Sequence, residues 1–244
     1  SSMEDAELKR VLKRNQRIGN LLAVMLHGYG AITLSDAHAM IEKEIGEAID
    51  AKWFRNFICI LSETYDLFHL SGDYIVDELV KDEAALIDAQ KAMGDLPYAA
   101  IDAKEAAKVR GFDYIEYTPQ LKELKAYLLK TYGVPAEELE ELLDETVYRI
   151  QLQESLSDVA AFFGNFIDFQ DTKEIQVLID KLMKVMRATR MWSFKGHTTD
   201  EIAPPAEEKP ALKVLNTPQA AVQASVTVND SNKKVGRNDP CPCG

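Results

Sequence analysis

The sequence predicts a mainly α-helical body that contains one short β-hairpin near the N-terminus and is followed by a flexible C-terminal tail. Apolar residues recur at three- and four-residue spacing over most of residues 5–190, which is typical of amphipathic helices. Residues 65–77 instead carry aromatic and β-branched residues around Ser71-Gly72, which favours a hairpin. After Gly196 the chain becomes rich in Pro, Ala, Ser and Thr and loses any amphipathic period, which favours a linker.

Helix-capping residues and glycines predict the boundaries of the first elements. A helix is expected from about Asp5 to Leu26, ending where Gly28-Tyr29-Gly30 permits a left-handed cap. Ala31-Ile32-Thr33 is expected to form a short strand. Ser35 is then expected to cap a second helix.

A third helix, capped by Asp50, is expected to precede the hairpin. The resulting order over residues 1–82 is helix, strand, helix, helix, hairpin. That order resembles a winged helix, and the resemblance implies a recognition helix near residues 51–65. Two of its polar residues, Lys52 and Arg55, are basic, and residues 1–82 carry 9 Lys/Arg against 14 Asp/Glu. Because DNA reading needs several cations, a role in protein interaction or in building the core is favoured for this unit.

A basic island lies on the first helix, and it comprises Lys9, Arg10, Lys13, Arg14 and Arg17. On a helix these side chains lie near one another, since residues three and four apart are neighbours. A solvated helix face is the favoured interpretation, and contact with phosphates or an acidic partner is the alternative.

Residues 83–196 are expected to form a helical unit packed on the first. A helix is expected to start at Asp82-Glu83, and the expected caps of later helices are Asp102, Thr118, Ser157 and Asp171. Residues 197–233 are expected to be a linker.

Composition excludes several classes of protein. The chain has 244 residues, a formal net charge of -12 and three cysteines. No apolar run is long enough to span a membrane, and the start lacks a basic-then-apolar signal region. Few cysteines argue against a disulfide framework, so a cytoplasmic protein is expected. The chain has no phosphate-binding loop, nucleophile elbow or His-Glu-x-x-His pattern, and we expect no enzymatic activity.

The one motif that carries chemistry lies in residues 234–244, which end Gly236-Arg237-Asn238-Asp239-Pro240-Cys241-Pro242-Cys243-Gly244. Cys241 and Cys243 are separated by one residue, so both thiolates can face one metal ion. Thiolates suit zinc, and a closed structural site needs four ligands. Two ligands are half of such a site, so by spacing alone the pair is either a metal hook, a redox-inert pair or a chance doublet.

This run of nine residues resembles the first half of the SEC-C motif, a zinc-binding element that also ends the bacterial preprotein translocase ATPase. The resemblance implies that Cys241 and Cys243 are zinc ligands and that an adjacent Cys-Cys or Cys-His pair completes the site. The sequence stops at Gly244 before such a pair, so zinc is expected only where that pair is present. The stretch from Thr189 to Thr198 also resembles a segment of helical SEC-C proteins.

From these features we expect a non-enzymatic adaptor: the helical body binds one protein, and the tethered SEC-C tail captures another. The partners that the resemblance implies are chaperones, ribosomes or components of secretion. The alternative is a winged-helix regulator that binds nucleic acid, based on the element order and the basic island. An enzyme assembled from scattered residues is the least favoured hypothesis, because no pattern supports one.

Overall fold

The computed structural model describes residues 2–100, 102–109, 112 and 114–203. Over these residues the chain is mostly helical and contains a small three-stranded antiparallel sheet, as the sequence predicts. The expected linker after residue 203 and the motif with Cys241 and Cys243 lie outside the described residues. No helix of the described part is long and apolar enough to cross a membrane.

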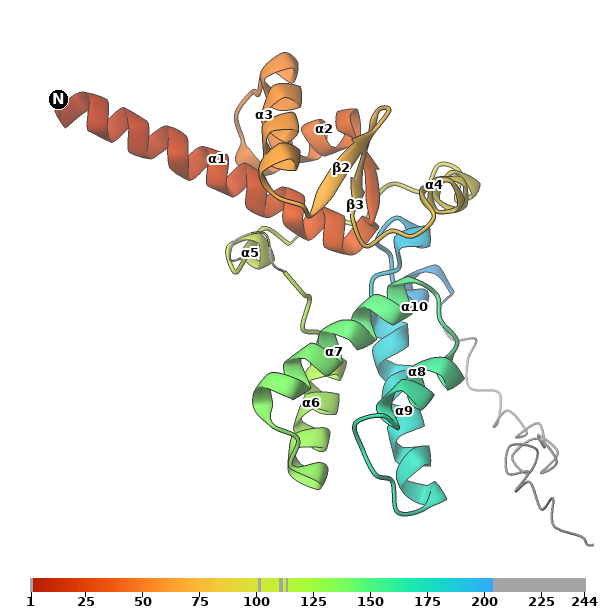
Figure 1. Cartoon of the computed structure of the whole chain (residues 1–244). Coiled ribbons are helices and arrows are strands. Elements are labelled where there is room, and N and C mark those ends of the chain that lie inside the picture. Colours follow the sequence, from red (N-terminus) through yellow and green to blue (C-terminus); the bar gives the residue numbers. More distant parts are fainter. Residues whose placement is uncertain (1, 101, 110–111, 113, 204–244) are drawn as a thin grey trace, which may run out of the picture. The chain divides into compact units, whose positions relative to one another are not determined.

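The N-terminal elements occur in the predicted order (Figure 1). They are α1 (Ser2–Tyr29), β1 (Ala31–Thr33), α2 (Leu34–Ile45), α3 (Ala51–Thr64), β2 (Phe68–Ser71) and β3 (Tyr74–Asp77). Strand β3 lies between the other two and pairs antiparallel with both, with Ile32 opposite Ile75 and Leu70 opposite Ile75. The first helix ends at Tyr29, three residues later than expected. Thr33, whose hydroxyl accepts from the amide of Asp36 at 3.0 Å, caps α2 in place of Ser35.

The remaining elements are helical. They are α4 (Glu83–Ala92), α5 (Ala103–Ala106), α6 (Pro119–Tyr132), α7 (Ala136–Gln151), α8 (Leu156–Phe163), α9 (Thr172–Ala188), the 3₁₀ helix η1 (Trp192–Phe194) and α10 (Thr199–Ile202). Asp102, Thr118 and Asp171 cap helices as predicted, and Asp82 caps α4. Ser155, rather than Ser157, caps α8, because its hydroxyl accepts from the amide of Asp158.

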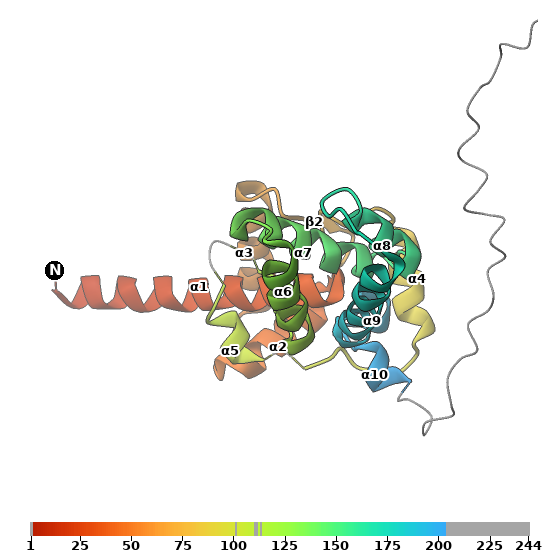
Figure 2. The same ribbon diagram turned by 90° about the horizontal axis from the view of Figure 1, so that it is seen from below.

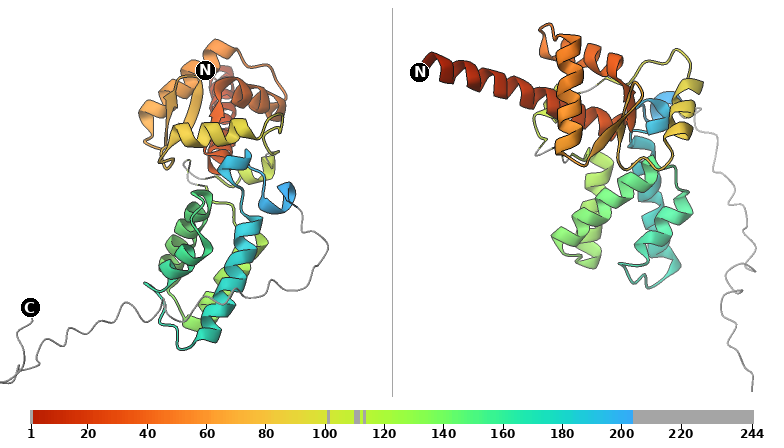
Figure 3. Two further views of the ribbon diagram at one scale, coloured as in Figure 1. Left: turned by 90° about the vertical axis from the view of Figure 1, so that its right-hand side faces the viewer. Right: turned by 45° about the horizontal axis from the view of Figure 1, so that its top comes forward.

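Two apolar cores form within residues 2–203. The first lies between α1, α2, α3 and the sheet and includes Ile18, Leu22, Phe54 and Ile75. The second fills the bundle of α6, α7, α8 and α9, whose apolar stripes face one another. Figure 3 shows the bundle beside the N-terminal elements.

The boundary between the cores differs from the one expected at residue 82. Ala99 and Ala106 are buried in the first core, α5 packs on α1, and α4 packs on β1 and η1. The cores divide between Phe112, which packs on the first, and Ile115, which packs on the second. Helix α5 buries Ala106 in the first core, whereas α4 buries the polar Gln90, whose amide donates to the carbonyls of Tyr29 and Trp192.

The body also continues past residue 196, where the linker was expected to begin. Residues 197–203 are described and include α10, and the chain divides into separate units only at Pro204. The composition of residues 197–203 does not identify them as part of the body, because polar contacts, and not regularly spaced apolar side chains, hold them in place.

The N-terminal half of α1 projects away from the rest of the body (Figure 2). Every side chain from Asp5 to Lys13 is exposed, whereas Ile18 and the apolar residues that follow it are buried. The C-terminal half of α1 therefore packs in the first core, whereas no described residue covers its N-terminal half.

Candidate functional site

The structure does not place the predicted metal ligands, since Cys241 and Cys243 lie outside the described residues. Within residues 2–203, leaving aside the gaps, no group of three or more His, Cys, Asp or Glu side chains could hold a metal ion. The described part instead concentrates its buried polar contacts around residues 189–203, the segment that comes directly before the tail. We call residues 189–203 the anchor segment.

Local structure turns the anchor segment back onto the body. Thr189 ends α9 with its hydroxyl donating to the carbonyl of Val185 at 2.8 Å. Arg190 then pairs with Thr198 as an isolated β-bridge, which brackets η1 between them. The turn that closes this loop needs left-handed backbone at Lys195 (φ 52°) and Gly196 (φ 82°).

The last turn of the anchor segment is a reciprocal cap. The Thr198 hydroxyl accepts from the amide of Glu201 at 3.2 Å, and the Glu201 carboxylate accepts from the amide of Thr198 at 2.9 Å. This capping box satisfies two amides that the start of a helix would otherwise leave without acceptors. It allows α10, a single turn, to form at the end of the described residues.

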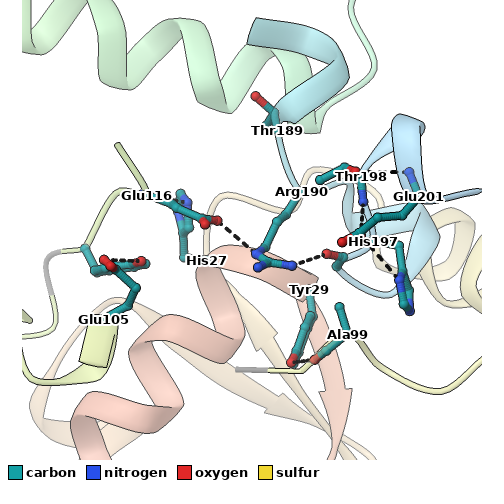
Figure 4. Close-up of polar contacts among 12 residues, drawn as sticks. His27, Tyr29, Ala99, Glu105, Glu116, Thr189, Arg190, His197, Thr198 and Glu201 are labelled. Atoms are coloured by element: carbon teal, nitrogen blue, oxygen red, sulfur yellow. Dashed lines mark hydrogen bonds and ion pairs between the residues drawn. The ribbon is translucent and has the colours of Figure 1, made fainter. Parts of the chain in front are cut away.

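Arg190 is the centre of the contacts in Figure 4. Its Nε donates to Oε2 of Glu116 at 2.9 Å, and its Nη1 donates to the carbonyl of Gly196 at 3.0 Å. Both side chains of the ion pair are about one quarter exposed. The guanidinium therefore joins the end of α9, the anchor turn and the segment before α6, using its fixed fork of donors.

His27 lies beneath this ion pair at the end of α1. Its Nε2 accepts from the amide of Glu116 at 3.2 Å, so the ring carries its proton on Nδ1. Burial, with the Arg190 guanidinium nearby, lowers the pKa of His27 from 6.5 to about 4. The ring is therefore neutral at pH 7 and serves as an acceptor.

Backbone carbonyls at the end of α1 hold the anchor segment from the other side. The carbonyl of His27 accepts from Nε1 of Trp192 at 2.8 Å and from Nε2 of Gln151 at 2.7 Å. The buried side chain of Gln90, on α4, contacts the carbonyls of Tyr29 and Trp192 at 2.8 and 2.9 Å. Buried polar groups are thus satisfied by residues far apart in the sequence.

Glycines allow the anchor segment to approach α1 closely. A Cβ on Gly30 would lie 2.6 Å from Cδ2 of Trp192, and a Cβ on Gly196 would overlap the ring of Tyr29. Both glycines have positive φ, so each position requires glycine for two separate reasons. The Tyr29 hydroxyl donates to the carbonyl of Ala99, so the connection between α4 and α5 is also held at the end of α1. We call the contacts of the anchor segment with the end of α1, α4 and the segment before α6 the junction.

The cavities around the anchor segment range from about 20 to about 480 Å³, and Lys195 lines the one of about 480 Å³. Beside His27, Glu105 and Arg190 a cavity of about 20 Å³ remains, too little for an organic ligand. Two larger ones share Trp192 and Gln151 as walls: about 380 Å³ against α4, and about 270 Å³ against the hairpin. Trp192 therefore separates two hollows.

The hollow against the hairpin holds one titratable group with an unusual environment. Asp77 ends β3, and its Oδ1 accepts from the amide of Leu79 at 2.9 Å. Burial raises the pKa of Asp77 from 3.8 to about 6. His27 lines the same hollow, but no hydrogen bond joins it to Asp77 within the described residues. One buried carboxyl with a backbone partner is not an acid–base pair.

Replacing Asp77 by Asn is expected to stabilise the fold at neutral pH. Asn keeps the oxygen that accepts from Leu79 and removes a buried charge. Because the pKa of Asp77 is higher in the folded state, its ionisation lowers stability as the pH rises from about 4 through 6. The gain in the free energy of unfolding should therefore be about 2 kcal/mol at pH 8 and smaller at pH 4.5.

Urea unfolding of Asp77→Asn at the two pH values checks this expectation. Asp73→Asn is the matched control, because the Asp73 side chain is 88% exposed at the hairpin turn. The control is expected to change stability by less than about 0.5 kcal/mol at either pH. An equal gain for Asp77→Asn at both pH values would show that its charge is not responsible.

The face of α3 is the second candidate surface. The exposed residues of α3 include Lys52, Arg55, Asn56, Ile60 and Glu63. Lys52 and Arg55 line a hollow of about 800 Å³ between α2, α3 and the hairpin turn. Nη1 of Arg55 lies 3.7 Å from Oδ1 of Asp73, so an acidic residue already faces one of the two cations.

Sequence reasoning missed most of the junction. His27, Gln90, Glu116 and Arg190 carry no motif. The contacts of Gln90 with Tyr29, Arg190 with Glu116 and Trp192 with His27 join residues 61, 74 and 165 positions apart. The sequence features that point to this region are the stretch from Thr189 to Thr198, which resembles a segment of helical SEC-C proteins, and the glycines at positions 28, 30 and 196.

No protein-family model, curated protein or solved structure matches the chain.

Proposed function

We propose that the protein is a non-enzymatic adaptor whose body binds one protein and whose SEC-C-like tail, held by zinc, captures another. The observation that carries this proposal is the junction at residues 189–203. A polar network and two close-packed glycines secure the segment that directly precedes the tail. Such an arrangement gives a tail one fixed point of departure from the body.

The donor set of the tail fits the proposal in part. Cys241 and Cys243 would supply two thiolate ligands, and zinc would hold them together as a rigid knuckle. A second pair of ligands, as the SEC-C resemblance implies, would complete the tetrahedral set. Zinc supplies folding energy in such small elements, so the knuckle would form when the metal binds.

Charge also supports separate roles for body and tail. Residues 1–203 carry 23 Lys/Arg against 36 Asp/Glu, whereas residues 204–244 carry 5 against 4. An acidic partner that the body repels could therefore be approached by the tail. Thirty-two residues separate Ala203 from Gly236, and a tether raises the effective concentration of the second binding event.

Affinity capture from a cell extract tests the proposal. We compare the complete gene product with Cys241→Ser/Cys243→Ser and with a chain that ends at Ala203. The cut after Ala203 keeps α10 and the capping box, whereas a cut at residue 196 would remove contacts of the body. Cys59→Ser, which removes a half-buried thiol on α3, controls for the loss of a cysteine.

A second candidate, a regulator that binds nucleic acid, is supported by the hollow between α3 and the hairpin with Lys52 and Arg55 in its wall. The helix–strand–helix–helix–hairpin order is that of a winged helix, and this face would then meet the DNA. Arg55 is faced by Asp73, which weakens the field toward phosphate. Titration with duplex DNA at two salt concentrations discriminates between the candidates, since phosphate contacts weaken steeply with salt.

A further inference from the structure

We infer that the hollow of about 270 Å³ between the base of the hairpin and Trp192 binds a small organic cation, an ammonium ion that carries apolar substituents. We call this cavity the hairpin hollow; its wall comes from α1, the base of the hairpin, the segment before α6, α7 and η1. The inference concerns the body alone and does not rest on the adaptor proposal. It is carried by the aromatic rings of the wall, by its carboxylates, and by the charges that face them.

Aromatic side chains from distant parts of the sequence form much of the wall of the hairpin hollow. They are Phe68, Phe112, Tyr114, Tyr148 and Trp192. The rings of Tyr148 and Trp192 lie 6.0 Å apart, with 59° between their planes. The Tyr148 hydroxyl donates to the carbonyl of Leu79 at 2.6 Å, and Nε1 of Trp192 donates to the carbonyl of His27. The polar ends of both side chains are therefore satisfied without a ligand, and the rings add surface that attracts a cation.

Carboxylates line the hairpin hollow from its mouth inward. The exposed residues of the wall mark the mouth, and they include Asp66, Glu78 and Leu79. Glu78 is already bonded to Nδ1 of His69 at 2.9 Å. Asp77 is less exposed, and its Oδ1 accepts from the amide of Leu79. Neither Asp66 nor Asp77 takes part in an ion pair within the described ranges, so both can accept a cationic ligand.

The hairpin hollow has an excess of negative charge. No Lys or Arg belongs to its wall in the part of the chain that the structure describes. His27 lines it but is neutral, because burial lowers the pKa of His27 to about 4. Lys81 lies 5.7 Å from the centroid of the Tyr148 ring but lines the other hollow, against α4. Burial raises the pKa of Asp77 to about 6, so this carboxylate is mostly ionised at pH 7, and a bound ammonium ion would supply its countercharge.

The size and lining of the hairpin hollow favour a small organic ion over a metal ion. Within the described residues no group of three or more His, Cys, Asp or Glu side chains could hold a metal. Leu26, Phe68 and Trp192 are buried in the wall, which favours methyl or alkyl groups at the deep end. The volume lies just below that of pockets that hold drug-sized ligands, so the occupant is small. Quaternary ammonium ions combine these properties, and aromatic walls bind them well.

Choline tests the inference, and its neutral control is the dimethylbutanol isostere in which a carbon atom replaces the charged nitrogen. The chain has two tryptophans, so a proton–nitrogen correlation spectrum shows two indole signals, which the variant Trp53→Phe assigns. Choline is expected to shift the indole signal of Trp192, which lines the hollow, and to leave that of Trp53 in place. At constant ionic strength, choline is expected to bind about tenfold more tightly than the isostere, because only choline carries a charge.

Two pairs of variants test the wall. Asp77→Asn is expected to weaken choline binding by about tenfold or more, and it keeps the oxygen that accepts from Leu79, so the fold is retained. Asp73→Asn makes the same change at an exposed position of the hairpin turn and is expected to leave binding unchanged. Tyr148→Leu is expected to weaken binding by about fivefold, whereas Tyr148→Phe, which keeps the ring, should retain most of the affinity.

Several results would overturn the inference. Choline that leaves the Trp192 signal in place, or that binds no more tightly than its neutral isostere, would show that the hollow does not select a cation. Equal binding of choline by Asp77→Asn and the natural chain would show that the carboxylate is not used. The amide of acetylated trimethyllysine provides a second arm and is expected to bind more weakly than choline. Tighter binding of this compound would assign the hollow to a lysine side chain of a partner protein instead of a free ion.

Discussion

Replacing Trp192 by Ala is expected to lower the free energy of unfolding of residues 1–203 by about 3–5 kcal/mol, the range typical of a large buried aromatic residue. Trp192 is 3% exposed, packs against Gly30 and lies 6.0 Å from the Tyr148 ring. Its loss would also remove the donor to the carbonyl of His27 and join the hollows of about 380 and 270 Å³ that it separates.

Urea unfolding followed by far-UV circular dichroism measures this loss. Trp53→Ala is the control, because Trp53 is only partly buried where it stacks on Phe57 at the edge of the first core. The control is expected to cost about 1 kcal/mol, from the lost stacking and the contact with Arg14. Similar losses for both variants would show that the anchor segment contributes no more to stability than an ordinary surface contact.

Replacing Gly196 by Ala is expected to have the second large effect. Gly196 has φ 82°, and an added Cβ would overlap the ring of Tyr29. The positive φ costs about 1 kcal/mol for a residue with a Cβ, and overpacking a close contact costs about 1–3 kcal/mol more. The anchor turn would have to move away from α1, which would strain the contacts of Arg190 with Gly196 and Glu116.

Gly46→Ala is the matched control for Gly196→Ala. Gly46 has φ 78°, close to that of Gly196, but a Cβ there would meet nothing within 4 Å. The control therefore isolates the cost of backbone conformation, about 1 kcal/mol. If thermal unfolding shows equal losses for the two alanine variants, the close approach of Gly196 to Tyr29 is not a source of stability.

Local features of this fold could be predicted from the sequence because their causes are local. Asp50, Thr118 and Asp171 cap helices where a short polar side chain precedes an apolar period. The hairpin forms around Ser71-Gly72, and Gly72 has the positive φ that its turn requires. These signals each involve a few neighbouring residues, so a single sequence is enough to identify them.

The junction could not be predicted, because its partners are distant in the sequence. The contact of Trp192 with the carbonyl of His27 spans 165 positions, and that of Arg190 with Glu116 spans 74. No spacing rule selects such pairs, since folding decides which buried polar groups meet. The placement of α4 has the same cause, because its buried Gln90 donates to the carbonyls of Tyr29 and Trp192, 61 and 102 positions away.

The capture experiment with the complete gene product tests the adaptor proposal most directly. We expect Cys241→Ser/Cys243→Ser and the chain ending at Ala203 to lose the same subset of partners, and to retain the partners of the body. Cys59→Ser should retain both sets. Zinc content measured in the same samples should fall with the loss of Cys241 and Cys243. Identical partner sets for all four proteins, or capture by the tail that is independent of both cysteines, would contradict the proposal.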